Sequence, residues 1–479
     1  MTIPTKKSIA IIGAGPVGLA AAAHALERGL TPIVLERGPD VAHAVRQWSH
    51  VRMFSPWEYN IDKAAERLLR TAGWNSPDPD AYPTGGEFVD GYLAPLATRT
   101  PLKDHIHLSA QVTQISRVGF DKVKTKGREA ASFEIRYQNG AGPKTVRADA
   151  VIDASGTWFA PNPAGANGLD AIGEAGVSGR IAYAMPDVFG KDRPRYAGKT
   201  VAVLGAGHSA IGTLIDLARL REEVPDTRLI WLMRGDKPEK AFGGGANDKL
   251  AARGELGATF ARLVGDGSIT VETEFRVTHM TAQSDKLHVG TGSASCGRHV
   301  LVDELIVATG FRPDLSFLRE LRIALDPALE CPPELAPLID PNEHSCGTVR
   351  PHGARELAMP ELGFYFAGMK AYGRAPTFLA VTGYEQVRSI VAEVAGDHAA
   401  ARRVELVLPE TGVCSGPAGY LAEKASACCG GPAPKSVDAC CAEDATAKTE
   451  GESGCGSAAS KAINEKQPFV VAASAKCCG

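Results

Sequence analysis

The sequence lacks a strong charge of either sign and a long hydrophobic run. Its formal net charge is −3 over 479 residues, which gives no electrostatic footprint for nucleic acid or anionic lipid. No apolar stretch reaches the about 18 residues that indicate a membrane-spanning helix. The first seven residues lead straight into an apolar strand, which we interpret as core and not as part of a signal peptide. We therefore expect a cytoplasmic protein that binds neither nucleic acid nor a membrane.

Closely paired cysteines are also missing from the first 400 residues, which contain only Cys296, Cys331 and Cys346. A dithiol that exchanges electrons with a cofactor needs two neighbouring thiols, as in C-x-x-C or C-x-x-x-x-C. A disulphide-reductase mechanism is therefore not expected, and we interpret these three thiols as structural. No C-x-x-C pair occurs anywhere in the chain, which disfavours a folded tetrahedral zinc site.

Two glycine fingerprints are present. Gly13–Gly18 follows the apolar run Ser8–Ile12, and Gly205–Ala210 follows Thr200–Leu204. In such a strand–turn–helix unit the first glycine makes the tight turn and the second lets the backbone approach a pyrophosphate. The third small residue lets the helix pack on the strand, and the helix N-terminus holds the phosphates. Either fingerprint alone can be a structural turn, but two of them indicate an enzyme that binds two dinucleotides.

The residue after the next strand distinguishes the two nucleotides. Thr31–Leu35 is followed by Glu36, close to the spacing of about 20 residues at which an acid binds ribose hydroxyls. A carboxylate there repels a 2′-phosphate, so the first site suits FAD or NAD. Leu229–Met233 is followed by Arg234, a cation that accommodates a 2′-phosphate, so the second site suits NADPH. An ordinary arginine at a strand end is the alternative for Arg234.

The order of these segments predicts an α/β fold with two Rossmann-like dinucleotide-binding domains, the second inserted in the first. We expect an FAD-binding domain at residues 1–164 and 303–400, an NADPH-binding domain at 165–302, and a flexible cysteine-rich tail at 401–479. We expect short antiparallel strands in the segments His105–Ser116, Ser132–Tyr137, Lys144–Ile152 and Ile269–Val302. Gly363–Gly368 is expected to be a last buried strand, and Thr377–Ala395 a closing helix.

With both fingerprints placed, the chain resembles the two-dinucleotide flavoproteins and, within them, the class B flavin-dependent monooxygenases. The resemblance covers roughly residues 8–395 and also rests on Asp153–Gly156, Gly198–Val201 and Ala308–Phe311. It implies FAD and NADPH as cofactors and O₂ as a reactant. The residues expected to bind the cofactors are, for FAD, Gly13, Gly15, Gly18, Glu36, Arg37, Trp48 and Gly368, and for NADPH, Gly205, Gly207, His208, Ser209, Ala210 and Arg234.

Trp48 falls where such enzymes often place a tryptophan beside the flavin, with a packing role as the alternative. His50 is the one candidate catalytic residue, with a packed or surface histidine as the alternative. Two features depart from the group. Its identifying stretch, F-x-G-x-x-x-H, is absent, and the counterpart Ser178–Asp187 has no histidine. Met369 follows Gly368, where many relatives have an aspartate that binds the flavin. These departures leave the monooxygenase subclass open.

The segment after Pro409 combines few large apolar residues with three vicinal cysteine pairs, and it is interpreted as flexible. Soft thiolates select soft ions such as Cu(I), Zn(II), Hg(II) and trivalent arsenic. The candidate metal ligands are Cys428, Cys429, Cys440, Cys441, Cys477 and Cys478. Similar tails occur on proteins of arsenic-resistance operons, whose products include flavin monooxygenases, and mercuric reductases also end in a vicinal pair. A tail whose thiols bind nothing is the alternative.

These observations together predict an FAD- and NADPH-dependent oxidoreductase of metalloid resistance, working as a monooxygenase. NADPH reduces the flavin by hydride transfer, and O₂ then supplies oxygen to a soft nucleophile such as As(III), a thioether or an amine. A flavin-dependent reductase of Hg(II) or another metal is one alternative. A metal-binding protein with a redox-sensing flavin scaffold is another. The oligomeric state stays open, with a homodimer as the candidate assembly.

Overall fold

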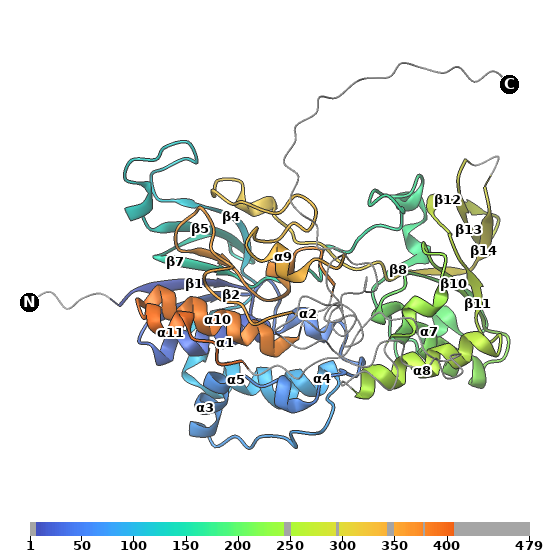
Figure 1. Ribbon diagram of the computed structural model, residues 1–479, viewed down its shortest axis with the longest axis horizontal. Helices are drawn as coiled ribbons and strands as arrows, with labels where there is room; N and C mark the ends of the chain where they lie inside the picture. Colours follow the sequence, from blue (N-terminus) through green and yellow to red (C-terminus); the bar gives the residue numbers. More distant parts are fainter. Residues whose placement is uncertain (1–5, 244–250, 294–296, 343–348, 377–378, 407–479) are drawn as a thin grey trace, which may run out of the picture. The chain divides into compact units, whose positions relative to one another are not determined.

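The structure is a computed structural model that describes residues 6–406, apart from 244–250, 294–296, 343–348 and 377–378 (Figure 1). Two five-stranded parallel sheets organise this part of the chain. The first sheet has the order β16-β7-β1-β2-β3 and the second has the order β11-β10-β9-β15-β8.

The strands of the first sheet are β1 (Ser8–Ile12), β2 (Thr31–Leu35), β3 (Ile106–His107), β7 (Ala150–Asp153) and β16 (Phe364–Phe366). Those of the second sheet are β8 (Ile181–Tyr183), β9 (Thr200–Leu204), β10 (Arg228–Leu232), β11 (Thr270–Glu272) and β15 (Glu304–Val307). In each sheet the chain leaves the fingerprint strand toward one side and later returns to pair on its other side: β1 lies between β2 and β7, and β9 lies between β10 and β15. The carboxyl ends of such strands form the crevice in which nucleotides bind.

The longer helices cover these sheets. The described helices are α1 (Pro16–Glu27), α2 (His43–Arg46), α3 (Lys63–Thr71), α4 (Gly85–Phe88), α5 (Ala94–Arg99), α6 (Arg193–Tyr196), α7 (His208–Glu223), α8 (Ala251–Gly265), α9 (Ala336–Ile339), α10 (Ala380–Ala395) and α11 (His398–Arg402). Helix α1 begins with Pro16 at its first position, where the missing N–H costs nothing, and its alanine-rich sequence is buried along most of its length.

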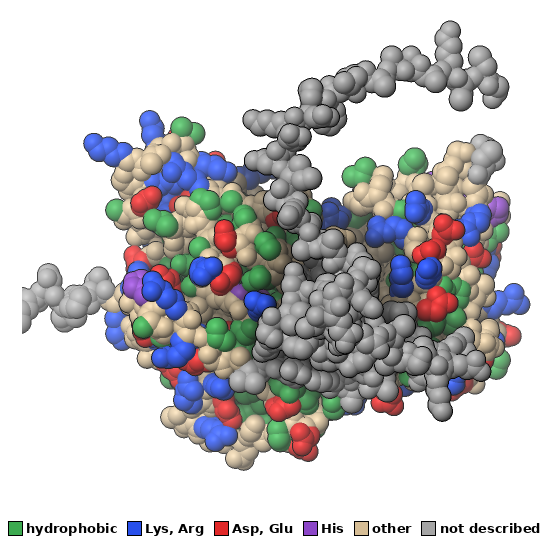
Figure 2. All heavy atoms as spheres, in the orientation of Figure 1, with side chains coloured by type: hydrophobic (Ala, Val, Ile, Leu, Met, Phe, Trp, Pro, Cys, Tyr) green, Lys and Arg blue, Asp and Glu red, His purple; other side chains and the backbone are tan. Residues whose placement is uncertain are grey.

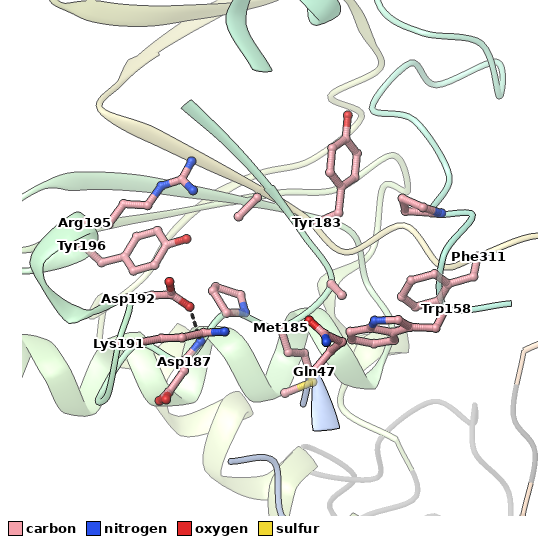
Figure 3. Close-up of a pocket in the computed structure, with 14 residues that line it drawn as sticks. Gln47, Trp158, Tyr183, Met185, Asp187, Lys191, Asp192, Arg195, Tyr196 and Phe311 are labelled. Atoms are coloured by element: carbon pink, nitrogen blue, oxygen red, sulfur yellow. Dashed lines mark hydrogen bonds between the residues drawn. The ribbon is translucent and has the colours of Figure 1, made fainter. Parts of the chain in front are cut away.

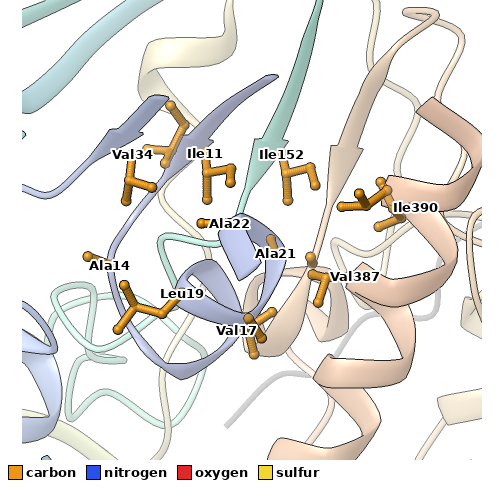
Figure 4. Close-up of a cluster of buried hydrophobic side chains, with 14 of the residues drawn as sticks. Ile11, Ala14, Val17, Leu19, Ala21, Ala22, Val34, Ile152, Val387 and Ile390 are labelled. Carbon is orange, nitrogen blue, oxygen red and sulfur yellow. The ribbon is translucent and has the colours of Figure 1, made fainter. Parts of the chain in front are cut away.

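The core of the first region lies between the sheet and helices α1 and α10. Figure 4 shows Ile11, Val34 and Ile152 of three adjacent strands facing α1, with Val387 and Ile390 of α10 beside that helix. All five side chains are fully buried, and each such burial contributes roughly 1.5–3 kcal/mol. Small alanines in α1 let the helix approach the sheet closely, which fixes the position of the fingerprint turn.

Two small antiparallel sheets accompany the large ones. The first contains β4 (Gln111–Arg117), β5 (Phe133–Asn139) and β6 (Gly142–Ala148), and the second contains β12 (Val277–Gln283), β13 (Lys286–Thr291) and β14 (His299–Val302). Two predicted strands are split by the structure. His105–Ser116 divides into β3 and β4, with Ser109 at a positive φ of 51° between them. Lys144–Ile152 divides into β6 and β7, because Asp149 bonds to Ser8 and turns the chain into the first sheet.

The predicted boundary at residue 302 between the second and first domains is too early. Strand β15 pairs in parallel with both β9 and β8, so the second sheet extends to Val307. The expectation of two Rossmann-like units, the second inserted in the first, is confirmed. The chain enters the second sheet after β7 and returns to the first sheet with β16.

The visible surface carries both signs of charge interspersed, without a large area of one sign (Figure 2). Within the described ranges, no helix has the length and apolar character that would let it cross a membrane.

Candidate functional site

The first fingerprint forms a turn that only glycines can make. Gly13 has a φ of +99°, and a Cβ there would lie 2.9 Å from the carbonyl oxygen of Ala154. A Cβ on Gly18 would lie 2.0 Å from the carbonyl oxygen of Gly13, so α1 packs directly on the turn. Around Gly15, by contrast, no atom lies within 4 Å of an added Cβ. This open position, at a helix N-terminus without a side-chain cap, fits the pyrophosphate of a dinucleotide.

Glu36 lies at the end of β2 with its carboxylate buried beside this turn. Its Oε2 accepts a hydrogen bond from the Ala14 N–H and its Oε1 accepts one from the Gly38 N–H, both at 2.8 Å. The neighbouring Arg37 is exposed and its guanidinium carbon lies 4.2 Å from the ring centroid of Phe159. The acid is thus held by the fingerprint itself, in the place where it can accept hydrogen bonds from ribose hydroxyls.

The second fingerprint repeats this geometry with one difference. Gly205 has a φ of +133°, and a Cβ there would meet the Ala308 carbonyl oxygen at 2.3 Å. Gly207 is open, with no atom within 4 Å of an added Cβ, and it precedes α7, which also has no side-chain cap. The third small residue is the fully buried Ala210. His208, at the start of α7, lies with its ring centroid 5.7 Å from that of Phe54.

Arg234 lies just beyond the end of β10 and is exposed. Its Nη1 donates a hydrogen bond of 3.2 Å to the carbonyl oxygen of Ala166. Its side chain forms no ion pair among the described residues, so its charge is available to a ligand. The position fits a 2′-phosphate at the carboxyl end of the second sheet. Both cradles therefore fit the dinucleotides that the sequence predicts for them.

The two candidates between the fingerprints, Trp48 and His50, lie in packed surroundings. Trp48 packs on the core of the first region and against Gly85, where an added Cβ would lie 2.6 Å from the indole. The Nε2 of His50 is buried and has no hydrogen-bond partner within the described part of the chain. Burial raises the pKa of Asp216 on α7, while the charges of Arg219 and His50 act to lower it. His50 therefore lies near α7.

Gly368 follows β16 and lies beside α1. Its N–H donates to Gln386 Oε1 at 2.7 Å, and a Cβ at this position would lie 3.1 Å from Val17. Sequence reasoning missed its neighbour Lys370, which is fully buried with its Nζ 3.2 Å from Asp153 Oδ2. The same Nζ donates to Ser155 Oγ at 3.1 Å. Met369 thus precedes a buried cation that joins the ends of β7 and β16.

A pocket of about 280 Å³ opens at the carboxyl end of β8 (Figure 3). It lies close to α7, because Met185 in its wall would meet a Cβ on Gly212 at 2.9 Å. Trp158, which follows the Asp153–Gly156 stretch, and Phe311, which follows β15, stack at one end. The lining residues are Gln47, Trp158, Pro161, Ala182, Tyr183, Ala184, Met185, Pro186, Asp187, Lys191, Asp192, Arg195, Tyr196 and Phe311.

This pocket contains the stretch without the family histidine. Tyr183 stands four residues after Gly179, where the F-x-G-x-x-x-H pattern has its histidine. Its hydroxyl donates to Glu174 Oε1 at 2.6 Å, and burial raises its pKa. The sequence could have indicated Tyr183 through this alignment alone. Tyr196 and Lys191 carry no motif, and only the structure brings them to the pocket.

Cysteine chemistry finds no support in the described residues. Cys331 is their only cysteine, and burial raises the pKa of its thiol to about 12, which keeps it protonated and unreactive. Nor does the described part of the chain contain a cluster of three or more His, Cys, Asp or Glu side chains that could hold a metal ion. The six predicted metal ligands, Cys428 to Cys478, lie outside the described residues.

Comparison with known proteins identifies relatives among the monooxygenases. Flavin-containing monooxygenase FMO GS-OX-like 2 of Arabidopsis thaliana is 23% identical over 244 residues, which is 46% of this chain and 49% of that protein. Flavin-containing monooxygenase 1 of Homo sapiens is 26% identical over 227 residues, covering 46% of this chain and 39% of that protein. The chain thus matches less than half the length of these relatives.

Solved structures share the fold over most of the chain. A bacillithiol disulfide reductase from Bacillus cereus superimposes with a TM-score of 0.59 at 18% identity, over 83% of this chain and 100% of that one. The cadaverine monooxygenase DfoA from Erwinia amylovora, bound to FAD, gives a TM-score of 0.57 at 13% identity, over 85% and 99%. These likenesses confirm the predicted fold.

A family profile described as pyridine nucleotide-disulphide oxidoreductase matches residues 10–333, more than half of the chain. The predicted class, an oxidoreductase with FAD and NADPH as cofactors, is confirmed by this match together with the monooxygenase relatives. Both fingerprints lie inside the matched residues. The chain therefore belongs to the pyridine nucleotide-disulphide oxidoreductase family.

Proposed function

We propose that this protein is an FAD- and NADPH-dependent monooxygenase that transfers one oxygen atom of O₂ to a small molecule carrying a soft nucleophilic atom. The observation that carries the proposal is a pair of complete nucleotide cradles without a neighbouring dithiol. The family includes disulphide reductases, which need such a thiol pair, and the first 400 residues contain no two cysteines close in sequence. The names of the sequence relatives favour oxygen chemistry instead.

The bound flavin supplies the redox and oxygen chemistry, and the chain supplies binding and orientation. Gly15 and Gly207 leave room for the two pyrophosphates, and the N-termini of α1 and α7 stabilise their charge. Glu36 binds ribose hydroxyls, and Arg234 binds the 2′-phosphate that distinguishes NADPH from NADH. The pocket beside α7 is the candidate binding site of the substrate. No described side chain is needed as a general acid or base, and His50 has no such role in this proposal.

A finer proposal concerns trivalent arsenic as one such nucleophile, with the protein acting in metalloid resistance. Its support is the vicinal cysteine pairs between Cys428 and Cys478, because adjacent thiolates bind soft ions. Changing all six cysteines to serine should abolish arsenite binding and leave NADPH oxidation with an organic substrate unchanged. Equal arsenite binding by the serine variant would refute this part alone.

The main test is turnover of the full-length, FAD-loaded protein with NADPH, under labelled ¹⁸O₂, with thioethers, amines and arsenite as substrates. We expect NADPH oxidation coupled to one labelled oxygen atom in the product. NADPH-driven reduction of a disulphide or of Hg(II), without label in any product, would refute the monooxygenase and favour a reductase.

A further inference from the structure

The pocket beside α7 has two ends of different chemistry. Figure 3 shows Trp158 and Phe311 together on one side and Lys191, Asp192 and Tyr196 on the other. Neither end contains a residue of a glycine fingerprint. The pocket therefore calls for a ligand whose own two ends differ.

The first end is aromatic. The rings of Trp158 and Phe311 lie with centroids 5.2 Å apart at an interplanar angle of 28°, and Met185 also lines the pocket. An isolated bridge between Pro161 and Phe311 holds the segment after β7 against the segment after β15. Stacked rings and a thioether form a wall that favours a flat, apolar ligand.

At the polar end, most groups already have partners. Arg195 donates to Glu304 Oε2 at 2.5 Å. The Asp187 carboxylate accepts the Gly190 N–H, and the Asp192 carboxylate accepts the Asp187 N–H, both at 2.9 Å. The positive charges of Lys191 and Arg195 balance the negative charges of Asp187 and Asp192, so the net charge of this end does not select the ligand. The choice of ligand therefore depends on which side chains at this end can still form hydrogen bonds.

Two side chains at this end have no hydrogen-bond or ion-pair partner within the described part of the chain. Tyr196 is fully buried, yet its hydroxyl has no hydrogen-bond partner in the described part of the chain. Figure 3 shows that hydroxyl directed into the pocket. Burial raises the pKa of Tyr196, so the group stays protonated and can donate. Lys191 forms no ion pair with any described residue, and its ammonium group adds a positively charged donor.

We propose that the pocket binds an aromatic carboxylate, with its ring against Trp158 and Phe311 and its carboxylate on the Tyr196 hydroxyl and the Lys191 ammonium. Binding of this ligand does not depend on the proposed function. Only the further statement that aromatic carboxylates are the substrate class rests on it. A buried hydroxyl left unpaired is costly, and an anionic oxygen acceptor removes that cost through a charge-assisted bond.

A suitable probe is 4-(methylthio)benzoate, which joins an aromatic carboxylate to an oxidisable sulfur. Its turnover balances as ArSCH₃ + O₂ + NADPH + H⁺ → ArS(O)CH₃ + NADP⁺ + H₂O. Sulfur gains one oxygen atom, and the other leaves as water with the two electrons of NADPH. Thioanisole is the matched control, because it has the same ring and sulfur without the carboxylate.

Binding of both probes is measured by calorimetry on the full-length, FAD-loaded protein and on Tyr196→Phe, Lys191→Met and the control Lys103→Met, an exposed lysine outside the pocket. We expect 4-(methylthio)benzoate to bind about tenfold or more weakly to the Tyr196 and Lys191 variants, since a bond to a charged group is lost. Thioanisole affinity should stay unchanged. Tyr196→Phe should keep or raise the Tm, because it removes a buried polar atom without a partner.

Three results would overturn the inference. These are equal affinity of the wild type for both probes, unchanged affinity in both pocket variants, and competition by NADP⁺ that disappears in Arg234→Glu. The last would make the pocket part of the NADPH site. Carboxylate-dependent binding without sulfoxide would support the pocket and refute the monooxygenase. Sulfoxide formed equally from both probes would support the monooxygenase and refute the pocket's selectivity.

Discussion

The two nucleotide cradles of this protein share a plan and differ in two residues. The third small position is Gly18 in the first and Ala210 in the second, so only the first helix rests on its turn without any side chain between. The charged residue beyond the second strand is the buried Glu36, directly after β2, in one cradle and the exposed Arg234, two residues after β10, in the other. The first cradle is therefore built into the core, whereas the second presents its selective group to the solvent.

Ion pairs show the same contrast between the two regions. In the first, Glu361 lies buried between Arg117 and Arg128, with both ion-pair distances at 2.8 Å, and Lys370 is buried against Asp153. In the second, the pair of Lys286 and Asp303 is partly exposed. A cofactor that stays bound suits a rigid, internally paired site, and a nucleotide that exchanges in each turnover suits an accessible one.

The largest expected effect comes from a substitution where α1 packs against the turn of the first fingerprint. Gly18→Ala puts a Cβ 2.0 Å from the Gly13 carbonyl oxygen, and backbone cannot yield as a flexible side chain can. We expect a cost above the ~1–3 kcal/mol typical of overpacked cores and loss of soluble, FAD-containing protein. Gly15→Ala is the control: it should fold but bind FAD weakly, because its Cβ meets no protein atom. Flavin absorbance of the purified proteins measures both. A yellow, stable Gly18→Ala protein would mean that the two cradles do not differ in this way.

The next largest effect concerns the buried charges. Lys370→Met leaves Asp153 buried without its cation, and we expect a loss of about 3–5 kcal/mol in the free energy of unfolding. Lys286→Met breaks a pair whose lysine side chain is 37% exposed, and should cost at most about 1 kcal/mol. Urea denaturation compares the two, and adding Asp153→Asn to Lys370→Met should recover most of the loss. Equal losses in the two single variants would remove the contrast between the regions.

The sequence predicts the fold where local signals suffice. Strands β1, β2 and β9 have the predicted bounds, because each is an apolar run ended by a glycine turn or a charged residue. The sequence places the run Glu304–Val307 in the first domain, but this run pairs in the second sheet. An apolar run records that a strand is buried, but its hydrogen-bonding neighbours depend on the whole topology, which explains this error.

The candidate site was predictable to the same extent. The fingerprint glycines carry a spacing that the backbone of the turn requires, so they can be read from the sequence. The pocket cannot, because its residues come from segments as distant as Gln47, Trp158, Tyr196 and Phe311. That Tyr196 has no hydrogen-bond partner is a result of packing and leaves no trace in the order of residues. The buried partner of Asp153, Lys370, was missed for the same reason.

A smaller effect sharpens the contrast in nucleotide selection. Arg234→Glu replaces an attraction for the 2′-phosphate with repulsion, and a bond to a charged group is worth ~1.5–3 kcal/mol. We expect kcat/KM for NADPH to fall about tenfold or more and the preference to shift toward NADH. Arg228→Glu, at the other end of β10, is the matched control and should change neither. An unchanged preference in Arg234→Glu would place the 2′-phosphate elsewhere.

The smallest effect concerns three histidines of the second antiparallel sheet, whereas the strands of the first antiparallel sheet contain no histidine. His288 lies with its ring 4.7 Å from that of His299 and 5.7 Å from that of His279, and its Nδ1 is buried without a partner in the described residues. Burial, followed by the neighbouring histidines, lowers its pKa from 6.5.

Because the folded pKa of His288 lies below the unfolded one, the unfolded chain takes up the proton first as the pH falls. The stabilising contribution of neutral His288 is complete above pH 6.5 and decreases below it, until the pH reaches the lowered folded value. We therefore expect the Tm to fall more steeply from pH 7.5 to about pH 5 in the wild type than in His288→Gln. The matched change His105→Gln, on the first region, should keep the wild-type slope. Parallel slopes in all three proteins would show that the histidine cluster does not couple stability to pH.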